Sequence, residues 1–135
     1  MLRPTDRDAT VAQARSIAHS VHLDDILETP VSILSHGQQR QLEIALALSG
    51  APRFILFDEP AAGLSPPERR DLVAILNALP AYIGYIIIEH DMDVALRVVE
   101  SVTMLHNGRV FKEGAPQEIE ADPEVQEIYL GAGHG

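Results

Sequence analysis

The sequence predicts an α/β domain with a largely parallel sheet. Two short apolar runs, residues 54–57 and 83–89, have the length and composition of strands that are buried on both faces. The segment between them carries an apolar stripe at helical spacing, formed by Leu72, Ile75, Leu76 and Leu79. Strand, amphipathic helix and strand in this order are typical of two parallel strands with the helix packed on the sheet.

The remaining segments are predicted to be helices and one hairpin. Asn107-Gly108 lies between the runs of residues 102–105 and 109–112, and this dipeptide is the strongest short signal for a β-hairpin. Caps, prolines and glycines mark the ends of the helices. The helices are expected over residues 11–27, 38–48, 67–79 and 91–99, from Pro116, and from Pro123 to Gly131.

The composition excludes several classes of protein. The chain has 135 residues, 46% of them hydrophobic, which suits one compact domain. Its net charge of -10 argues against a nucleic-acid-binding protein, and the absence of cysteine excludes disulfides and thiolate chemistry. No apolar run approaches the roughly 20 residues of a membrane-spanning helix, and Met1–Thr10 is charged where a signal peptide is apolar. We therefore expect a cytoplasmic protein.

The first segment whose residues could bind a ligand or take part in catalysis is Leu34–Arg40, at the start of the second predicted helix. Ser35 and Gln38 have the spacing of an ordinary capping box, which satisfies free amide groups at a helix start. The same geometry offers a hydroxyl, exposed N–H groups beside Gly37 and the positive end of the helix dipole, which suit a phosphate group. From these residues alone, the capping box is the commoner interpretation.

The second segment is the buried strand that ends in Asp58, Glu59 and Pro60. Adjacent carboxylates are costly to bury, so they serve packing poorly, and ligands of open α/β sheets gather at the carboxyl ends of the strands. Asp58 could hold Mg²⁺ through water, and Glu59 could act as a general base toward a water molecule. The alternative is a solvated acidic turn.

The third segment, Ile86–Asp91, again places polar groups at the end of a buried strand. A single histidine such as His90 is more often structural than catalytic. The three segments together resemble the ABC-type ATPase family in their order and residues. Leu34–Gln38 is similar to its signature loop, with His36 in place of the usual glycine, and Phe54–Glu59 resembles its Walker B strand.

The resemblance implies a role for each matching residue. Residues 62–65 are similar to the D-loop, which lies at the interface of two nucleotide-binding subunits, and His90 to the switch histidine, which contacts the γ-phosphate. Asp58 would serve Mg²⁺, and Glu59 would orient the attacking water. The γ-phosphate of ATP held by the opposite subunit would be contacted by Ser35, Gly37 and Gln38. The interface segment consists of Ala62, Gly63, Leu64 and Ser65.

The resemblance also implies a fold and partners. The chain would be the C-terminal part of a three-layer P-loop NTPase fold with a closing β-hairpin. Residues 1–52 would form a helical signature subdomain, and residues 53–135 would belong to the ATPase core. ATP and Mg²⁺ would be the cofactors. The partners would be a second nucleotide-binding subunit and transmembrane permease subunits at the inner face of the cell membrane, with no nucleic acid.

Within the family, the chain looks most like ATPases of branched-chain amino acid importers. The resemblance lies in Gln39–Ala45, Pro60–Leu64, Glu89–Met92 and the tail Tyr129–Gly131. DNA-repair and chromosome-structuring ATPases share a similar signature, but they carry long heptads before it, which this sequence lacks, and the charge of -10 is unsuited to DNA.

One element of the family is absent from the sequence. A P-loop needs G-x-x-x-x-G-K-[ST], and the single lysine, Lys112, stands between Phe111 and Glu113. In folds of this family the P-loop strand lies beside the strand that carries the switch histidine, so the resemblance implies an unpaired edge on the strand of residues 83–89. We expect the isolated chain to bind ATP poorly and to self-associate or be weakly stable. The alternative function is a non-catalytic truncated module that docks on a full subunit or a permease.

Overall fold

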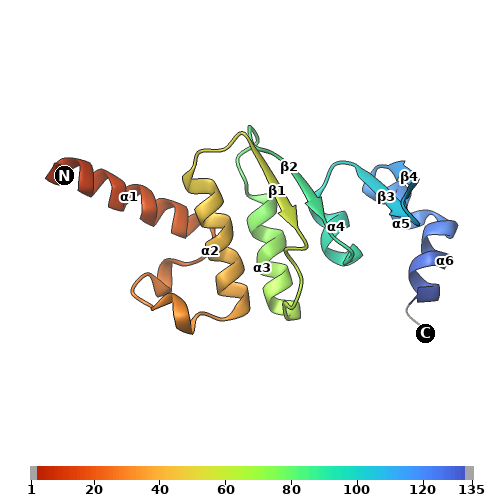
Figure 1. Cartoon of the computed structure of the whole chain (residues 1–135), viewed down its shortest axis with the longest axis horizontal. Helices are drawn as coiled ribbons and strands as arrows, with labels where there is room; N and C mark the ends of the chain where they lie inside the picture. Colours follow the sequence, from red (N-terminus) through yellow and green to blue (C-terminus); the bar gives the residue numbers. More distant parts are fainter. Residues whose placement is uncertain (1–2, 133–135) are drawn as a thin grey trace. The chain divides into compact units, whose positions relative to one another are not determined.

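The computed structural model describes residues 3–132. The chain divides into two compact units, one ending at Glu89 and the other beginning at His90 (Figure 1). The first unit contains α1 (Pro4–Ser20), α2 (His36–Ser49), β1 (Phe54–Asp58), α3 (Pro66–Asn77) and β2 (Gly84–Ile88), with short 3-10 helices at Asp24–Ile26 and Val31–Ile33. The second contains α4 (Met92–Val98), β3 (Val102–His106), β4 (Arg109–Gly114), α5 (Pro116–Ala121) and α6 (Pro123–Ala132).

Helix α1 differs from the helix expected over residues 11–27. It begins at Pro4, whose missing N–H is tolerated in the first turn, and the Asp6 carboxylate accepts the N–H of Arg3 at 3.3 Å. It ends at Ser20, because His22 adopts a φ of 61° and the Leu23 N–H returns to the Ala18 carbonyl at 2.9 Å. The prediction was wrong because the apolar pattern continues beyond the helix into buried loop residues.

The first unit is built around a parallel β–α–β arrangement, as predicted. Strands β1 and β2 pair in parallel, with Phe54 opposite Gly84 and Asp58 opposite Ile88. Ile55 and Phe57 are buried, and α3 contributes three more buried side chains, Leu72, Ile75 and Leu76. The α/β fold class with a parallel sheet is thereby confirmed.

The expectation that both strands are buried on both faces is wrong for this chain. In β1 every second side chain is exposed, Leu56 to 73% and Phe54 to 55%. Ile86 and Ile88 of β2 are also exposed. The described part of the first unit packs helices against one face only, so the other face stays open. We call Phe54, Leu56, Ile86 and Ile88 the open face.

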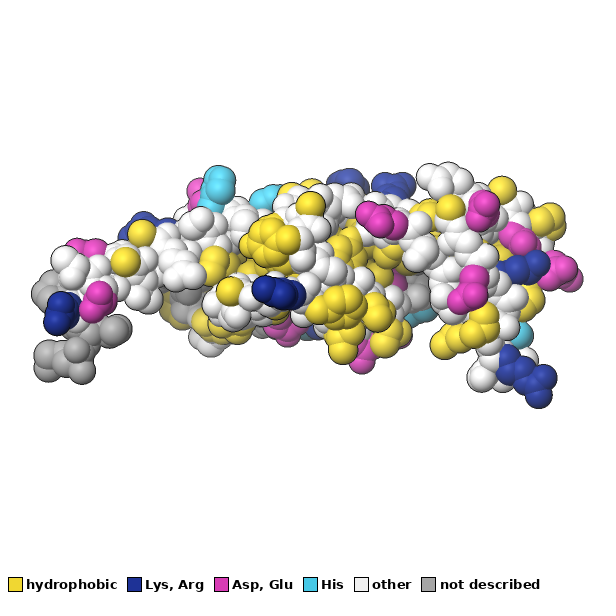
Figure 2. Space-filling view, turned by 90° about the horizontal axis from the view of Figure 1, so that it is seen from above, with side chains coloured by type: hydrophobic (Ala, Val, Ile, Leu, Met, Phe, Trp, Pro, Cys, Tyr) yellow, Lys and Arg dark blue, Asp and Glu magenta, His cyan; other side chains and the backbone are white. Residues whose placement is uncertain are grey.

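The sheet of the first unit also has an unpaired edge. Within residues 3–132, β2 pairs only with β1, as the sequence led us to expect. Apolar side chains are visible on the surface of the first unit in Figure 2.

None of the helices in the described part of the chain is both long enough and apolar enough to cross a membrane.

The second unit contains the predicted hairpin, which α5 and α6 follow. Strands β3 and β4 are antiparallel, and Asn107 and Gly108 between them have φ values of 50° and 74°. Hairpins with a two-residue loop favour a turn with positive φ at both central residues. Asn and Gly adopt positive φ readily, which explains the Asn-Gly dipeptide at this turn. The core of this unit is formed by Met104, Ile119 and Val125, with Met92, Leu96, Val102 and Phe111 packed against it.

Candidate functional site

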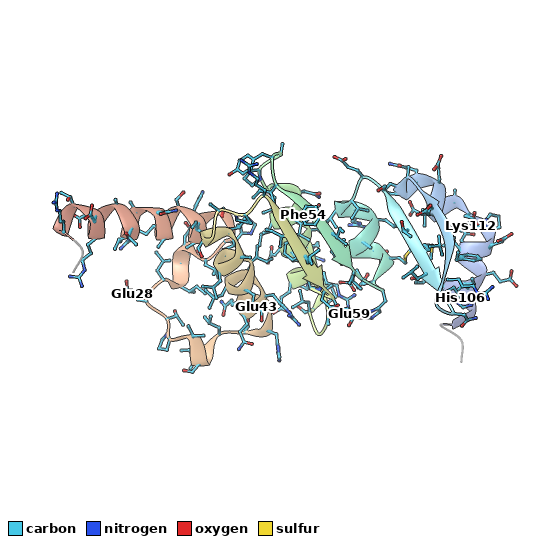
Figure 3. The ribbon with its side chains drawn as sticks, turned by 45° about the horizontal axis from the view of Figure 1, so that its top comes forward. Glu28, Glu43, Phe54, Glu59, His106 and Lys112 are labelled. Atoms are coloured by element: carbon cyan, nitrogen blue, oxygen red, sulfur yellow. The ribbon has the colours of Figure 1, made fainter. Side chains whose placement is uncertain are left out.

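The two predicted carboxylates lie together at the carboxyl end of β1. Asp58 is the last residue of the strand and Glu59 follows it, and both are exposed. Figure 3 shows Glu59 just beyond one end of β1, with Phe54 at the other end. The exposure agrees with the cost of burying charge, and it leaves both side chains accessible from outside.

The backbone of Glu59 is held in an unusual conformation. Its φ is 47°, a region that residues other than glycine rarely adopt. The Glu59 N–H donates to the Ile88 carbonyl at 2.7 Å, which extends the pairing of β1 and β2 by one residue and holds the strained residue in place. Strain of this kind costs roughly 1–3 kcal/mol and concentrates at functional sites.

Glu89 is a site residue that the sequence reasoning missed. Its carboxylate Oε2 accepts the N–H of Ala61 at 3.1 Å, so the end of β2 is tied to the loop that follows β1. Glu89 is half-buried. The signal in the sequence was its place directly after three isoleucines, in the same position relative to β2 that Glu59 has relative to β1.

The start of α2 has the capping geometry that the sequence indicated. Ser35 Oγ accepts the N–H of Gln38 at 3.2 Å, and Gln38 Oε1 accepts the N–H of Ser35 at 2.9 Å. Ser35 and His36 are exposed, whereas Gly37 is buried. The expectation of exposed N–H groups is wrong for Gly37 and Gln38, because their N–H groups are bonded to Glu68 Oε1 and Ser35 Oγ. The capping box is therefore confirmed, and the hydroxyl of Ser35 remains on the surface, where a phosphate could reach it.

A second missed residue, Glu68, reaches the start of α2 from α3. The Gly37 N–H donates to Glu68 Oε1 at 3.2 Å, and the Ser65 N–H donates to Glu68 Oε2 at 2.8 Å. The N–H and the hydroxyl of Ser65, followed by the N–H of Gly37 and the charge of His36, hold the pKa of Glu68 below its ordinary value. A glutamate at the third position of a helix indicates a cap, so the bond of Glu68 to Ser65 could be predicted from the sequence. The contact of Glu68 with Gly37 could not be predicted.

The segment of residues 62–65 leads from the carboxylates to α3. Gly63 has a φ of 75°, and a Cβ added there would meet no atom within 4 Å, so glycine is required by the backbone conformation alone. Leu64 is buried in the first unit, whereas Gly63 and Ser65 are exposed. Ser65 is the cap residue of α3.

His90 belongs to the second unit and is its first residue. It follows Glu89 directly and is exposed. The next residue, Asp91, caps α4 as predicted, because its carboxylate accepts the Val94 N–H at 3.3 Å. The structure thus brings Asp58, Glu59 and Glu89 to one end of the parallel sheet, and a place for His90 beside Glu59 stays a prediction.

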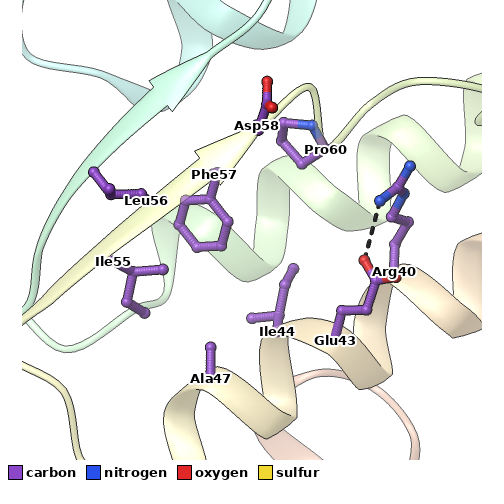
Figure 4. Close-up of a pocket in the computed structure, with 9 residues that line it drawn as sticks. All are labelled: Arg40, Glu43, Ile44, Ala47, Ile55, Leu56, Phe57, Asp58 and Pro60. Atoms are coloured by element: carbon purple, nitrogen blue, oxygen red, sulfur yellow. Dashed lines mark hydrogen bonds and ion pairs between the residues drawn. The ribbon is translucent and has the colours of Figure 1, made fainter.

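A shallow hollow lies between α2 and β1 (Figure 4). Ile55 and Phe57 point toward Ile44 and Ala47 of α2, and an ion pair of Arg40 with Glu43 (3.0 Å) borders the hollow. Its volume of about 170 Å³ is below the roughly 300–1,000 Å³ of small-molecule pockets, so the hollow by itself does not accommodate a nucleotide.

The carboxylates fit a magnesium ion that is held jointly with phosphate groups. The described residues contain no group of three or more His, Asp or Glu side chains that could enclose a metal ion. Magnesium keeps several waters, however, and is usually bound by one or two carboxylates plus phosphate oxygens. The exposed carboxylate of Asp58 at the strand end meets that requirement.

Two family models match the sequence. Residues 3–62 match the model described as ABC transporter. Residues 113–135 match the model described as branched-chain amino acid ATP-binding cassette transporter. The first match includes Ser35–Gln38, Asp58 and Glu59, and the second covers the end of the second unit.

Individual relatives agree with the family models. The lipopolysaccharide export system ATP-binding protein LptB of Acidithiobacillus ferridurans is 39% identical over 131 residues, which are 96% of this chain and 53% of LptB. The high-affinity branched-chain amino acid transport ATP-binding protein BraF of Pseudomonas aeruginosa is 34% identical, over 96% of this chain and 51% of BraF. The chain thus spans about half the length of the curated relatives that it matches.

Solved structures show the same relationship. The ADP conformation of MJ1267, an ATP-binding cassette of an ABC transporter, is 32% identical and superposes with a TM-score of 0.76. The match covers 90% of this chain and 50% of that cassette. The α/β arrangement described above is therefore part of an ABC ATPase cassette, and the chain belongs to the ABC transporter ATP-binding domain family.

Proposed function

We propose that this chain carries half of the catalytic apparatus of an ATP-hydrolysing subunit of an ABC transporter. The observation that supports the proposal most directly is the strained Glu59, held beside the exposed Asp58 at the carboxyl end of a parallel strand. The bond of the Glu59 N–H to the Ile88 carbonyl fixes the backbone at this residue, and a catalytic carboxylate needs a defined direction, whereas a solvated acidic turn does not.

Each carboxylate has a distinct role in the proposed reaction. Asp58 would hold Mg²⁺ through water, and when bound the ion supplies positive charge to the phosphate oxygens. Glu59 would orient the attacking water and accept its proton. Glu89 would keep the intervening loop in place through its bond to the Ala61 N–H. The sequence contains no P-loop, so the amides that cradle the phosphates would come from residues outside it.

The start of α2 would act on the ATP of an opposite subunit. The Ser35 hydroxyl is exposed, and the first turn of the helix presents the positive end of its dipole. Together with Gly37 and Gln38 it would stabilise charge on the γ-phosphate. His90 would contact the γ-phosphate in its own subunit. Residues 62–65 would lie at the interface of the two subunits.

The proposal can be tested in a fusion protein. The part of LptB that this chain does not match would be joined to this chain, and ATP hydrolysis would be measured with Mg²⁺. We expect turnover in the fusion and a loss of about 100-fold or more with Glu59→Gln, because general-base catalysis typically contributes that much. The matched control is Glu28→Gln, the same change at an exposed loop position (Figure 3), which should leave turnover unchanged. Equal rates in both variants would refute the role of Glu59.

We further propose import of branched-chain amino acids as the transport process, working at the membrane through permease subunits. The match of residues 113–135 and the relationship to BraF support this substrate class. LptB, whose name refers to lipopolysaccharide export, is the competing precedent. The fusion should restore leucine uptake to cells that lack BraF. Restored growth of LptB-depleted cells without leucine uptake would favour the export alternative.

A non-catalytic docking module is the second candidate function. It is favoured by the open face, where Leu56 is 73% exposed, because apolar surface of this kind is suited to a protein contact. If the chain is such a module, the fusion should fold but hydrolyse no ATP. The Glu59→Gln change should then have no effect on the binding of the fusion to a full-length relative. The division into a signature subdomain (1–52) and an ATPase core part (53–135) belongs to the catalytic proposal.

A further inference from the structure

One carboxylate joins two segments that are far apart in the sequence. Glu68 Oε1 accepts the Gly37 N–H at 3.2 Å, and Glu68 Oε2 accepts the Ser65 N–H at 2.8 Å. Gly37 lies in the signature-like loop at the start of α2, whereas Ser65 ends the segment of residues 62–65. Both oxygens of the side chain are therefore used, each on a different segment.

The packing around Gly37 is specific to this contact. A Cβ added to Gly37 would lie 2.7 Å from Glu68 Cγ and 2.7 Å from Glu68 Oε1, closer than real side chains approach. Gly37 is helical, unlike Gly63, whose φ is 75°. A side chain at position 37 would therefore have to displace the Glu68 side chain, whereas the backbone conformation of Gly37 is open to any residue.

Comparable caps in the same chain do not make such a link. Glu118 occupies the same third position of α5 and accepts the Ala115 N–H at 2.9 Å, and Gln38 accepts the Ser35 N–H at 2.9 Å. In the described residues, the side-chain bonds of Glu118 and Gln38 to backbone N–H groups stay within their own helix start. Capping alone therefore accounts for one oxygen of Glu68 and leaves the bond to Gly37 unexplained.

We propose that Glu68 is a positioning residue that couples the signature-like loop (Ser35–Gln38) to the D-loop-like segment (Ala62–Ser65). The inference rests on the proposed function, because that function places Ser35, Gly37 and Gln38 at the γ-phosphate and residues 62–65 at the subunit interface. A displacement of the Gly37 N–H acts on the same carboxylate that holds Ser65. Nucleotide contact at one segment is thereby transmitted to the other within a single subunit.

The charges around Glu68 favour its ionised form. The pKa of Glu68 lies below its ordinary value, mainly because Ser65 donates both its N–H and its hydroxyl, with the Gly37 N–H and a charged His36 acting in the same direction. His36 is in the first turn of α2, and Arg69 and Asp71 follow Glu68 on α3. Glu68 is accordingly an anion at neutral pH and remains one in mild acid.

The test is a pH titration of the 135-residue chain by proton–nitrogen NMR. We expect the amide signals of Gly37 and Ser65 to share one inflection below the ordinary pKa of glutamate, because both N–H groups bond to the same carboxylate. Glu68→Gln should remove that inflection from both signals. Glu118→Gln is the matched control, because Glu118 accepts the Ala115 N–H at the start of α5, and it should leave the inflection of Gly37 and Ser65 unchanged. A His36→Gln variant should keep the shared inflection, because both N–H groups still bond to Glu68.

Hydrogen exchange read by mass spectrometry gives a second measurement that tolerates self-association. Glu68→Ala should accelerate exchange of peptides containing residues 35–38 and 62–65 together, by roughly tenfold, whereas Glu118→Ala accelerates only the start of α5. Gly37→Ala, which expels the Glu68 side chain, should reproduce the effect at residues 62–65. Different inflections for Gly37 and Ser65, or acceleration at one segment alone, would overturn the proposal.

Neither measurement requires nucleotide, so the coupling and the proposed function fail separately. If Gly37 and Ser65 share an inflection but the fusion hydrolyses no ATP, the structural link through Glu68 is supported and its proposed role in catalysis is refuted. In an active fusion, Glu68→Gln should lower kcat with little change in KM for ATP, because the coupling acts after ATP is bound. A purely structural role would instead lower the amount of folded enzyme and leave both constants of the remainder unchanged.

Discussion

The two sheets of the protein differ in how much apolar surface the chain itself covers. The antiparallel hairpin of β3 and β4 contributes Met104 to a core that α5 and α6 complete with Ile119 and Val125. The parallel pair of β1 and β2 has one packed face and one open face, on which Ile88 is 60% exposed. All of the covering residues of the hairpin lie within residues 90–135, close in sequence.

This difference follows from how the two kinds of sheet are made. A hairpin forms from neighbouring segments and can face water on one side, so a short stretch of chain suffices to complete it. Parallel strands need a crossover connection and normally carry helices on both faces, which is why their sequences are apolar throughout. The first unit therefore has the sequence of a doubly covered sheet but covers only one of its faces.

The largest effect is expected on the packed face. Ile75→Ala in α3, where the side chain is 1% exposed, should lower the free energy of unfolding of the first unit by about 2–5 kcal/mol, because it leaves a cavity in a close-packed core. Leu56→Ala removes a similar side chain from the open face of the same unit and should change it by less than about 0.5 kcal/mol. Denaturant unfolding followed by circular dichroism compares the two. Equal losses would mean that Leu56 is covered in solution.

The next effect concerns association through the open face. Leu56→Lys and Ile88→Lys together should shift the chain toward monomer in sedimentation velocity, because they place charges on an exposed apolar surface beside an unpaired strand edge. The matched control is Leu105→Lys with Val110→Lys on the exposed surface of the hairpin, which should change the association state less. Association that is unaffected by the first pair would place the contact elsewhere.

A smaller effect is expected at one glycine in each unit. Gly63→Ala and Gly108→Ala should each cost about 1–2 kcal/mol, because both positions have φ near 75°, which residues with a Cβ rarely adopt. An added Cβ would meet no atom within 4 Å at either position, so the cost comes from the backbone conformation alone. The cost at Gly63 should appear in the unfolding of the first unit and the cost at Gly108 in that of the second. Hydrogen exchange resolves the two. A loss in both units from either change would show that they unfold together.

The smallest effect separates the two units by pH. In the second unit, Lys112 Nζ lies 3.2 Å from an Asp122 oxygen and 3.4 Å from a Glu124 oxygen. These two carboxylates raise the pKa of Lys112, Asp122 foremost. Burial alone would raise the pKa of Asp122, but the N–H groups of Val125 and Glu124 together with Lys112 outweigh it and hold that pKa below its ordinary value.

The signs give different pH profiles. A carboxylate whose pKa is lowered in the folded state stabilises the fold at pH values above its unfolded pKa. This stabilisation is lost as pH falls through the folded pKa, which applies to Asp122 and, in the first unit, to Glu68. A lysine whose pKa is raised, such as Lys112, stabilises the fold below its unfolded pKa, and this stabilisation is lost as pH rises through the folded pKa. Acid below about pH 4 should weaken both units, and alkali above about pH 10 only the second. Lys112→Met should abolish the alkaline loss in exchange measurements, whereas an alkaline loss that persists in this variant would contradict the assignment.

Local chemistry made several parts of the structure predictable. Ser35 with Gln38, Asp91 and the Asn107-Gly108 dipeptide each act on backbone groups a few residues away, and each was found where it was expected. The two carboxylates at the end of β1 were predictable because polar residues that end an apolar run mark the edge of a sheet.

The contacts that escaped prediction join distant segments or depend on coverage. No short sequence pattern indicates the bond between Glu68 and Gly37 or the bond between Glu89 and Ala61, because the partners are 31 and 28 positions apart. The positive φ of Glu59 was equally hidden, since nothing about a glutamate indicates that conformation. The coupling and the strain on which the proposals rest were therefore visible only in three dimensions.

For this protein, the order of residues sufficed to define the strands, the helix caps, the hairpin turn and the family, because these depend on short-range hydrogen bonding and on the periodicity of apolar side chains. The tertiary structure decided which face of the parallel sheet is covered, which amide groups share the Glu68 carboxylate, and where the backbone is strained. Those properties depend on which surfaces meet after the chain has folded. Periodicity states only that an apolar surface exists, and packing determines what covers it.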